Sequence, residues 1–349
     1  MIGIDISRHS VKIIRLSNTR PARLLAHCWQ EVPSGTMEKG EVRNESVMRK
    51  VILDSLQQCS IPMSVRDTVI ASIPETESFL RVIEIPHMDE SEISEAVQWE
   101  VAQHIPFGLE NVYLDWQMVR NKPRPGSDRL EVLVGAAEKR VVDPLHKLLA
   151  SVGLDVGALE LESQAIVRAL ISPELREKRG LLVVDLGASA TNVVVHDRGT
   201  VRFTASLQKG ARELYGPLDA AEREAITGRP KEVTAAAAAA LAQKLQVGMD
   251  SLVIEVHGVV EFYTGLDADN QVNEILLTGG GANLPGLDAA FLRHFDNVHV
   301  QRGNPWVNVI ALGKKIQSPI NIQESVHYAT AIGLALRQVL RPHVSYARA

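Results

Sequence analysis

Residues 2–14 are Ile2-Gly3-Ile4-Asp5-Ile6-Ser7-Arg8-His9-Ser10-Val11-Lys12-Ile13-Ile14: an apolar run, an acidic residue, a polar turn and a second apolar run. Such a pattern predicts two buried strands joined by a turn. The pattern returns in residues 181–195, Leu181-Leu182-Val183-Val184-Asp185-Leu186-Gly187-Ala188-Ser189-Ala190-Thr191-Asn192-Val193-Val194-Val195, where Asp185 takes the place of Asp5. A chain that repeats one hairpin at this distance is expected to contain two halves of similar architecture.

Length and composition limit the architecture and the partners. The 349 residues carry a formal charge of −5; 45% of them are apolar and only 4% are aromatic. At roughly 100 to 200 residues per domain, this length predicts about two domains. The apolar content excludes intrinsic disorder over most of the chain. Because mild acidity offers no broad basic surface, we expect protein or nucleotide partners and no nucleic acid.

The cysteines and the charged residues indicate the compartment. Only Cys28 and Cys59 are present, so we expect no disulfide framework and a reducing environment. Charges at Asp5, Arg8 and Lys12 interrupt the first apolar runs and argue against a secretory signal. No stretch of about 18 apolar residues could cross a bilayer. We therefore expect a cytoplasmic protein that reaches a membrane only through a protein partner, without direct insertion.

Two inserts interrupt the repeated halves. We expect residues 1–180 to form the first half, with an α/β insert at about 75–150, and residues 181–349 to form the second, with a mostly helical insert at about 205–268. In the first insert, Pro86 and Pro106 bracket an amphipathic helix with Asp89 as its expected cap. Strands and a final helix are expected, in order, at 69–73, 79–85, 112–119, 130–136 and 140–152.

A glycine turn follows the predicted strand at 274–278 and precedes a predicted helix at 287–295. It reads Gly279-Gly280-Gly281-Ala282-Asn283. Only glycine lets a backbone approach a phosphate or a nucleoside this closely. We therefore predict that Gly279, Gly280, Gly281 and Asn283 contact a nucleotide.

The two hairpin turns are candidate phosphate sites. The turn residues that could donate a hydroxyl or backbone hydrogen bond to phosphate are Ser7, Ser10, Gly187, Ser189 and Thr191. Asp5 and Asp185 would face each other across a cleft and hold Mg²⁺ through water, because Mg²⁺ retains much of its hydration shell. Lys12 would add a positive charge. Alternatively, each aspartate only stabilises its own turn, but the pair of hairpins with the glycine turn favours a nucleotide site.

Several common motifs are absent. Gly313-Lys314-Lys315 lacks the upstream glycine and the hydroxyl of a Walker A loop, and the glycine turn lacks the third glycine of the dinucleotide fingerprint. The turn that contains Ser189 lacks the closing glycine of a serine-hydrolase elbow. The 11 histidines form no zinc-binding motif.

In order along the chain, the two hairpins, the glycine turn and the helix expected at 328–336 resemble motifs of the actin and Hsp70 ATPase superfamily. They resemble its first phosphate, second phosphate, adenosine and second connecting motifs. Within that superfamily, the chain resembles the PilM family of type IV pilus assembly proteins, which is related to the cell-division protein FtsA. Besides the hairpins, the residues that carry this resemblance are Trp99-Glu100, Ile105-Pro106-Phe107, Asp115 and Asn304-Pro305-Trp306.

The resemblance implies a two-lobed actin-like (ribonuclease H-like) α/β fold, in which the first insert is an FtsA-type extra subdomain. It also implies an ATP-binding scaffold of a pilus machine, with Mg²⁺ and ATP between the lobes. A groove beside the insert would hold the cytoplasmic tail of a PilN-like bitopic inner-membrane protein; other pilus components are further candidate partners. The candidate groove residues, which could equally form the core of the insert, are Phe79, Ile83, Ile93, Val97 and Val101.

Departures from the family pattern leave alternatives open. Arg8 and His9 occupy a turn that the family builds from small residues, and Ser7 replaces a glycine. Arg8 either contacts phosphate or crowds the site, and in the second case the chain is an interaction module without nucleotide. A small-molecule kinase of the same superfamily is another alternative, although no carboxylate base beside a sugar pocket can be singled out. Because no water-activating residue is evident, we expect slow ATP hydrolysis at most.

Overall fold

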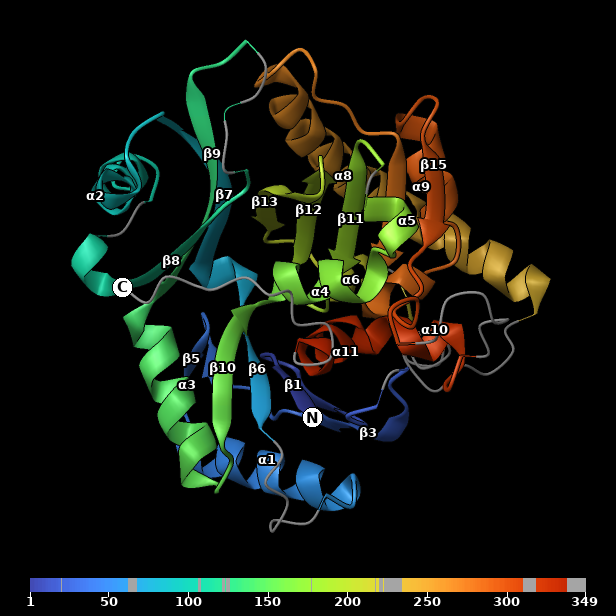
Figure 1. Ribbon diagram of the computed structural model, residues 1–349. Helices are drawn as coiled ribbons and strands as arrows, with labels where there is room; N and C mark the ends of the chain where they lie inside the picture. Colours follow the sequence, from blue (N-terminus) through green and yellow to red (C-terminus); the bar gives the residue numbers. More distant parts are fainter. Residues whose placement is uncertain are drawn as a thin grey trace.

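The structure, a computed structural model, describes the chain except for residues 20, 62–67, 106–107, 121–122, 124–125, 177, 217, 220–221, 223–233, 310–317 and 338–349. Pro106 and Phe107, which contribute to the family resemblance, therefore lie outside the described residues. The strands form two large sheets at the centres of two lobes, drawn one above the other in Figure 1. Two helices lie between these sheets: α4 (Glu162–Leu170) and α11 (Ala329–Leu336).

The two sheets repeat one topology. The first-lobe order is β10-β6-β1-β2-β3, and the second lobe repeats it as β15-β14-β11-β12-β13. In each lobe a central hairpin is antiparallel and its first strand is also parallel to the next strand in the sheet, so both predicted hairpins are confirmed. The strands of the two sheets are β1 (Ile2–Ile6), β2 (Ser10–Leu16), β3 (Leu24–Glu31), β6 (Val69–Ile73), β10 (Val156–Leu161), β11 (Leu181–Leu186), β12 (Thr191–Asp197), β13 (Thr200–Leu207), β14 (Glu274–Thr278) and β15 (His299–Arg302).

The insert continues the second-lobe sheet. Strands β7 (Ser78–Pro86), β9 (Arg129–Glu138) and β8 (Val112–Met118) follow β13 in that order, so that β8 forms the edge. The junction is the antiparallel β13–β7 pair, where Phe203 lies opposite Arg81. Helix α2 (Glu90–Val101) packs on these strands. Asp89 is its N-cap residue, as predicted, but its side chain accepts no capping hydrogen bond.

Helices α1 (Glu45–Gln58) and α3 (Lys139–Ser151) contribute to the first-lobe core. Asn44 starts α1 because its side chain accepts a hydrogen bond from the Val47 amide at 3.2 Å. Leu145 and Leu148 of α3 pack with Ile4 of β1, so this helix contributes to the core of the first sheet although it follows the insert strands in sequence. Burial of these apolar faces provides the main stabilisation of the lobe.

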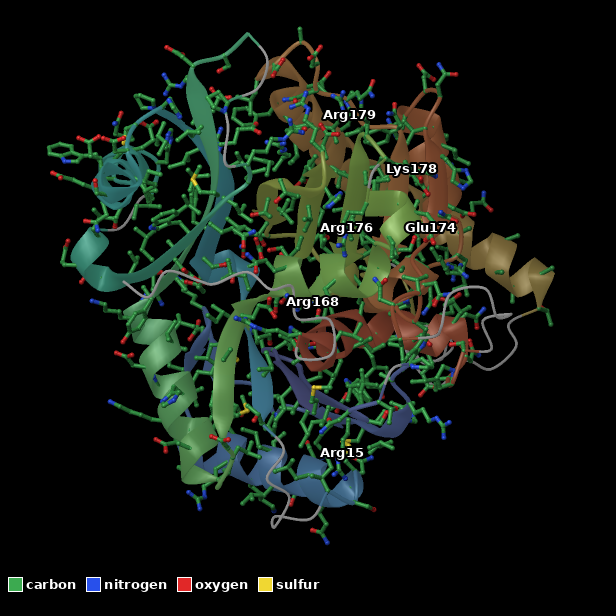
Figure 2. All side chains as sticks on the ribbon, viewed as in Figure 1. Arg15, Arg168, Glu174, Arg176, Lys178 and Arg179 are labelled. Atoms are coloured by element: carbon green, nitrogen blue, oxygen red, sulfur yellow. A yellow bond between two sulfur atoms is a disulfide. The ribbon has the colours of Figure 1, made fainter. Side chains whose placement is uncertain are left out.

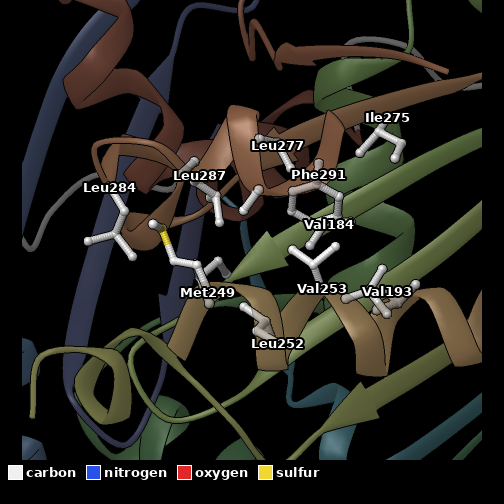
Figure 3. Close-up of a cluster of buried hydrophobic side chains, with 14 of the residues drawn as sticks. Val184, Val193, Met249, Leu252, Val253, Ile275, Leu277, Leu284, Leu287 and Phe291 are labelled. Atoms are coloured by element: carbon white, nitrogen blue, oxygen red, sulfur yellow. The ribbon is translucent and has the colours of Figure 1, made fainter. Parts of the chain in front are cut away.

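The second-lobe core lies between its sheet and two helices. Helix α8 (Ala235–Gly265) starts at Thr234, whose hydroxyl accepts from the Ala237 amide. Its buried face, with Met249, Leu252 and Val253, packs with α9 (Leu287–His294) and the strands, as Figure 3 shows. Shorter elements are β4 (Met37–Glu38), β5 (Glu41–Val42), α5 (Pro173–Arg176), α6 (Ala211–Leu214), α10 (Ile322–Ser325), η1 (Glu75–Glu77), η2 (Leu109–Asn111), η3 (Gly280–Asn283) and η4 (Val326–Tyr328).

The two cysteines require a correction. We expected no disulfide, but Cys28 on β3 and Cys59 after α1 form one, closing a separation of 31 residues. The disulfide depends on the tertiary structure, because Cys28 points from its strand toward the end of the helix that covers it. The positions of two cysteines far apart in the sequence do not show that they lie close together in the fold.

Close backbone contacts fix the helices between the lobes. A Cβ on Gly3 would lie 2.1 Å from the Ala331 carbonyl oxygen of α11, and a Cβ on Gly333 would lie 1.8 Å from the Ala165 carbonyl oxygen of α4. Arg168, labelled between the lobes in Figure 2, donates to Glu160 at 2.8 Å and to the Gly333 carbonyl at 2.9 Å. Glycine at both positions thus allows α11 to pack tightly. None of the described helices has the length and apolarity that crossing a bilayer requires.

Candidate functional site

The two hairpins place Asp5 and Asp185 at equivalent positions. Asp5 lies opposite Lys12 in the β1–β2 register, and Asp185 lies opposite Asn192 in the β11–β12 register. The two carboxylates are close enough for the charge of Asp5 to raise the pKa of Asp185. The structure therefore brings both aspartates together between the lobes.

Asp5 and Lys12 form a buried ion pair. The Lys12 Nζ lies 3.0 Å from one carboxylate oxygen of Asp5, and the Ser72 hydroxyl donates to the other at 3.1 Å. Burial alone would lower the pKa of Lys12, but the charges of Asp5, Asp185 and Glu162 outweigh it and raise the pKa above its usual value. Lys12 therefore remains positively charged at neutral pH.

Asp185 has a different environment. Burial raises its pKa to about 6; Lys12 opposes this shift, whereas the charges of Asp5 and Glu75 add to it. Among the residues that the structure describes, no donor forms a hydrogen bond with its carboxylate. The backbone of Gly279 packs directly against it, because a Cβ there would lie 2.4 Å from Asp185 Oδ1. This carboxylate is available to a ligand.

Two glutamates that the sequence did not reveal complete the cluster: Glu75 is buried and Glu162 is half-buried. Glu162, the first residue of α4, accepts from the Glu75 amide at 3.3 Å and from the Asn192 side chain at 3.0 Å. Burial, together with Asp5 and Asp185, raises its pKa well above the usual value. Burial also raises the pKa of Glu75. In sequence, both are glutamates at the start of a helical turn, where an acidic residue is commonplace.

His327 is a further site residue that sequence reasoning missed. A Cβ on Gly280 would lie 3.2 Å from its Nδ1, so the ring sits against the glycine turn. Burial, assisted by the charge of Lys12, lowers the pKa of His327 to about 4, which keeps the imidazole neutral at physiological pH. Its position at η4 brings it beside a turn far away in sequence.

The hydroxyls of the two turns are partly engaged within the protein. Ser7 Oγ accepts from the Ser10 amide at 3.1 Å and lies 3.3 Å from Ser10 Oγ. Thr191 is buried and donates to the Lys209 carbonyl at 2.7 Å. The Gly187 amide donates to the Ala190 carbonyl at 3.0 Å and so closes its own turn.

Ser189 belongs to the second hairpin turn, and the glycine turn packs against the same hairpin. Ser189 packs against Gly210, since a Cβ there would lie 2.5 Å from the Ser189 nitrogen. Gly279 has φ +82°, and Gly281 packs on Leu186, so glycine is required at both positions by the second hairpin itself. Asn283 donates to the Gln323 carbonyl at 2.6 Å.

The charge balance of the site fits a hydrated cation. Asp5, Asp185 and Glu162 share the charge of Lys12. Burial raises the pKa of Glu75, Glu162 and Asp185, and neighbouring carboxylates add to the shift at Glu162 and Asp185. Across the described residues, no three histidine, cysteine, aspartate or glutamate side chains form a direct metal-binding set. Mg²⁺ held through its own water needs fewer protein ligands than such a set.

The predicted groove residues belong mainly to the core of the insert. Ile83, Ile93, Val97 and Val101 are buried between α2 and the strands, and Phe79 packs half-buried against them. A cavity of about 210 Å³ lies instead on the other side of these strands, between β8, β9, β10 and α4. Gly135 helps to open it, because a Cβ there would meet its neighbours only at 3.5 Å or more.

The comparisons with known proteins agree with this architecture. Residues 3–339 match the family of type IV pilus assembly protein PilM. The PilM–PilN type IV pilus biogenesis complex contains a chain that is 24% identical, with a TM-score of 0.77 over 97% of this chain and 98% of that chain.

More distant structures share the fold. Ethanolamine utilization protein EutJ from Carboxydothermus hydrogenoformans is 16% identical, with a TM-score of 0.54 over 96% of this chain and 88% of that one. Diol dehydratase-reactivating factor, in a nucleotide-free form, is 10% identical, with a TM-score of 0.52 over 97% and 99%. The two-lobed actin-like fold expected from the sequence is confirmed, and the chain belongs to the PilM family of type IV pilus assembly proteins.

Proposed function

We propose that this protein is a nucleotide-binding scaffold of a type IV pilus assembly machine, and that it holds the cytoplasmic tail of a PilN-like inner-membrane protein. The main support is the cavity between β8 and β10, the edge strands of the two large sheets. An edge strand has free backbone donors and acceptors to which an extended peptide can add. The likeness to a chain of a PilM–PilN complex supports the same partner.

The residues that line the cavity indicate which peptide side chains would fit it. Leu114, Leu133 and Leu161 provide apolar walls, which favour aliphatic anchors. Glu160 is already bonded to Arg168, whereas burial raises the pKa of Asp115, a cavity residue on β8. We therefore propose that an aliphatic tail lies along β8 with one amide or cationic group near Asp115.

Filling the cavity tests the peptide site. Gly135→Leu places a side chain into the space without requiring an unusual backbone angle, and Gly258→Leu on the exposed face of α8 is the matched control. With a labelled peptide of the PilN-like tail, fluorescence anisotropy should show affinity weakened at least about 10-fold by Gly135→Leu and unchanged by the control. Absence of binding to the unsubstituted protein, or equal binding by both variants, would overturn the proposed groove.

The second part of the proposal is that Mg·ATP lies between the lobes. Asp5 and Asp185 would hold the hydrated cation, Lys12 would face the phosphates, and the backbone at the Gly279–Gly281 turn would face the nucleoside. Mg²⁺ would neutralise charge on the phosphates. Calorimetric titration with Mg·ATP should show binding that Asp185→Ala abolishes and that Asp54→Ala, an exposed substitution on α1, preserves. Equal affinity of the Asp185→Ala variant would remove this assignment.

We propose that slow turnover of ATP depends on Glu162. Burial, together with the charges of Asp5 and Asp185, raises its pKa, which favours proton uptake by this carboxylate. Glu162→Gln should reduce phosphate release by at least about 10-fold without weakening Mg·ATP binding. Phosphate release that is rapid in this variant would exclude Glu162 as the proton acceptor.

A further inference from the structure

Helix α8 carries large apolar side chains on its solvent-exposed face. Four of the nine exposed large hydrophobic residues in the described part of the chain belong to this helix and its C-cap, so apolar exposure is concentrated there: Val247, Ile254, Phe262 and Leu266. Val247 is 82% exposed and Ile254 57%. Single exposed apolar residues are ordinary, but a group of them on one helix marks an interaction surface.

These side chains alternate with small residues along one row of the helix, which we call the α8 seam. At about 100° per residue, its members fall within about 80° of the helix circumference: Val247, Ser251, Ile254, Gly258, Phe262 and Gly265. The buried residues of α8, among them Met249 and Val256, lie on the opposite side. A Cβ on Gly258 or on Gly265 would meet no described atom within 4 Å. The seam therefore has open space at its small residues.

The α8 seam is complementary to itself. Antiparallel pairing about a two-fold axis near residue 256 places each large side chain opposite a small one of a second copy, or within one residue of it: Val247 with Gly265, Ile254 with Gly258, and Phe262 with Ser251. Parallel pairing would instead place large residues against each other and glycine against glycine, which packs poorly. A surface that fits a second copy of itself about a two-fold axis is what an isologous dimer requires.

The charges beside the seam suit the same pairing. In the antiparallel register, Glu261 lies within one residue of the position opposite Asp250 of the second copy. Arg293 Nη2 and His294 Nε2 lie 2.6 and 3.4 Å from Asp250 Oδ1, so basic groups surround that position. The Glu261 side chain is 71% exposed and would meet them. Glu255, the carboxylate nearest the axis, is paired with a lysine of its own chain.

We propose that the α8 seam binds the α8 seam of a second copy of this chain in an antiparallel two-fold dimer. No residue of α8 lines the peptide cavity, so the dimer would carry two such cavities and could hold two tails at once. One pair of helices buries less than the roughly 1,600 Å² of a standard interface. We therefore expect a reversible dimer with a Kd of about 10–100 µM.

Sedimentation velocity of the full chain, without nucleotide or peptide, at about 1 to 200 µM tests the dimer. Ile254→Lys should raise the Kd at least about 10-fold, because two ammonium groups would be buried near the axis. Leu25→Lys on β3 is the matched control, since Leu25 is 55% exposed and Ile254 57%. The control should leave the Kd unchanged, and thermal unfolding should be the same for all three proteins.

A spin label at Gln246→Cys tests the orientation. Gln246 is exposed beside the seam, and Cys28 and Cys59 are joined in a disulfide, so the new cysteine takes the label. Antiparallel pairing separates the two labels by about 20 residues along the helices, or about 30 Å, whereas parallel pairing brings them within about 15 Å. Pulsed electron paramagnetic resonance at a concentration that favours the dimer should therefore show the longer distance.

Three results would overturn the proposal. One is a chain that stays monomeric over the whole concentration range. Another is a dimer that both lysine variants weaken equally, or that neither weakens, because its interface would then lie elsewhere. The third is a label separation of about 15 Å or less, which would exclude the antiparallel pairing.

Discussion

The hairpin β1–β2 and the hairpin β11–β12 share their register and turn length but differ at the position opposite the aspartate. Lys12 pairs with Asp5, whereas Asn192 faces Asp185 and directs its amide to Glu162. One carboxylate is therefore compensated within its own hairpin, and the other has a pKa of about 6. The two hairpins have similar backbones, but only Asp185 lacks a positively charged partner within its own hairpin. A bound cation can therefore neutralise Asp185.

A second difference concerns what covers each hairpin. Gly3 in β1 lets α11 pack directly on the strand, whereas the equivalent Val183 in β11 packs in a side-chain core with Ile166 of α4. The first lobe is thus joined to the interlobe helices by backbone contact and the second by side chains. Exchanging residues between the hairpins tests each of these distinctions.

The largest effect is expected from Gly3→Val, which installs the residue of the second hairpin in the first. Its Cβ would lie 2.1 Å from the Ala331 carbonyl oxygen and 2.6 Å from the Ala335 nitrogen, and neither backbone atom can move independently. We expect a loss of more than about 3 kcal/mol in the free energy of unfolding, measured by urea denaturation. A loss under about 1 kcal/mol would show that α11 is not fixed there.

Lys12→Met should have the next largest effect, because it leaves Asp5 buried without its partner. Breaking such a pair costs about 3 kcal/mol of stability at pH 7. The double variant Lys12→Met with Asp5→Asn should recover much of this loss, since it removes the stranded charge as well. If both single and double variants lose the same stability, packing of Lys12 rather than charge explains the effect.

Asp185→Asn should instead stabilise the protein without nucleotide. The pKa of Asp185 in the folded protein, about 6, lies above the ordinary 3.8. The contribution of Asp185 to the free energy of unfolding is therefore fully present below about pH 4 and is lost as the pH rises through 6. At pH 7.5 the variant should gain about 1–2 kcal/mol, a value reduced by the partial exposure of the carboxyl. Urea denaturation from pH 4 to 7.5 measures the difference in free energy of unfolding between the two proteins. A difference that did not grow with pH would contradict this prediction.

The smallest effect is expected from Ser7→Gly, which gives the first turn the residue of the second. It removes the hydroxyl that accepts from the Ser10 amide, and one such bond contributes about 1 kcal/mol. Thermal unfolding should therefore shift by only a few degrees. A much larger loss would mean that the first turn depends on its side chains in a way that the second does not.

The sequence predicted features that depend on local pattern. The hairpins around Asp5 and Asp185 were predictable because alternation of apolar runs and turns is a local property, and each aspartate is the penultimate residue of its strand. Glu162 and His327 were not, because their place depends on how α4 and η4 cross between the lobes. Likewise, the period of Ile93 and Val97 identified an apolar helix face, but only the fold shows which side of the strands that face covers.

The central claim is that the two hairpins face each other across a single nucleotide, and a crystal structure with Mg·ATP tests it most directly. We predict the metal between Asp5 and Asp185, contacting them through water, with the phosphates between the turns at 7–10 and 187–190 and the nucleoside beside Gly279–Gly281. A nucleotide bound anywhere else, or one that contacts the hairpin of a single lobe, would contradict the account.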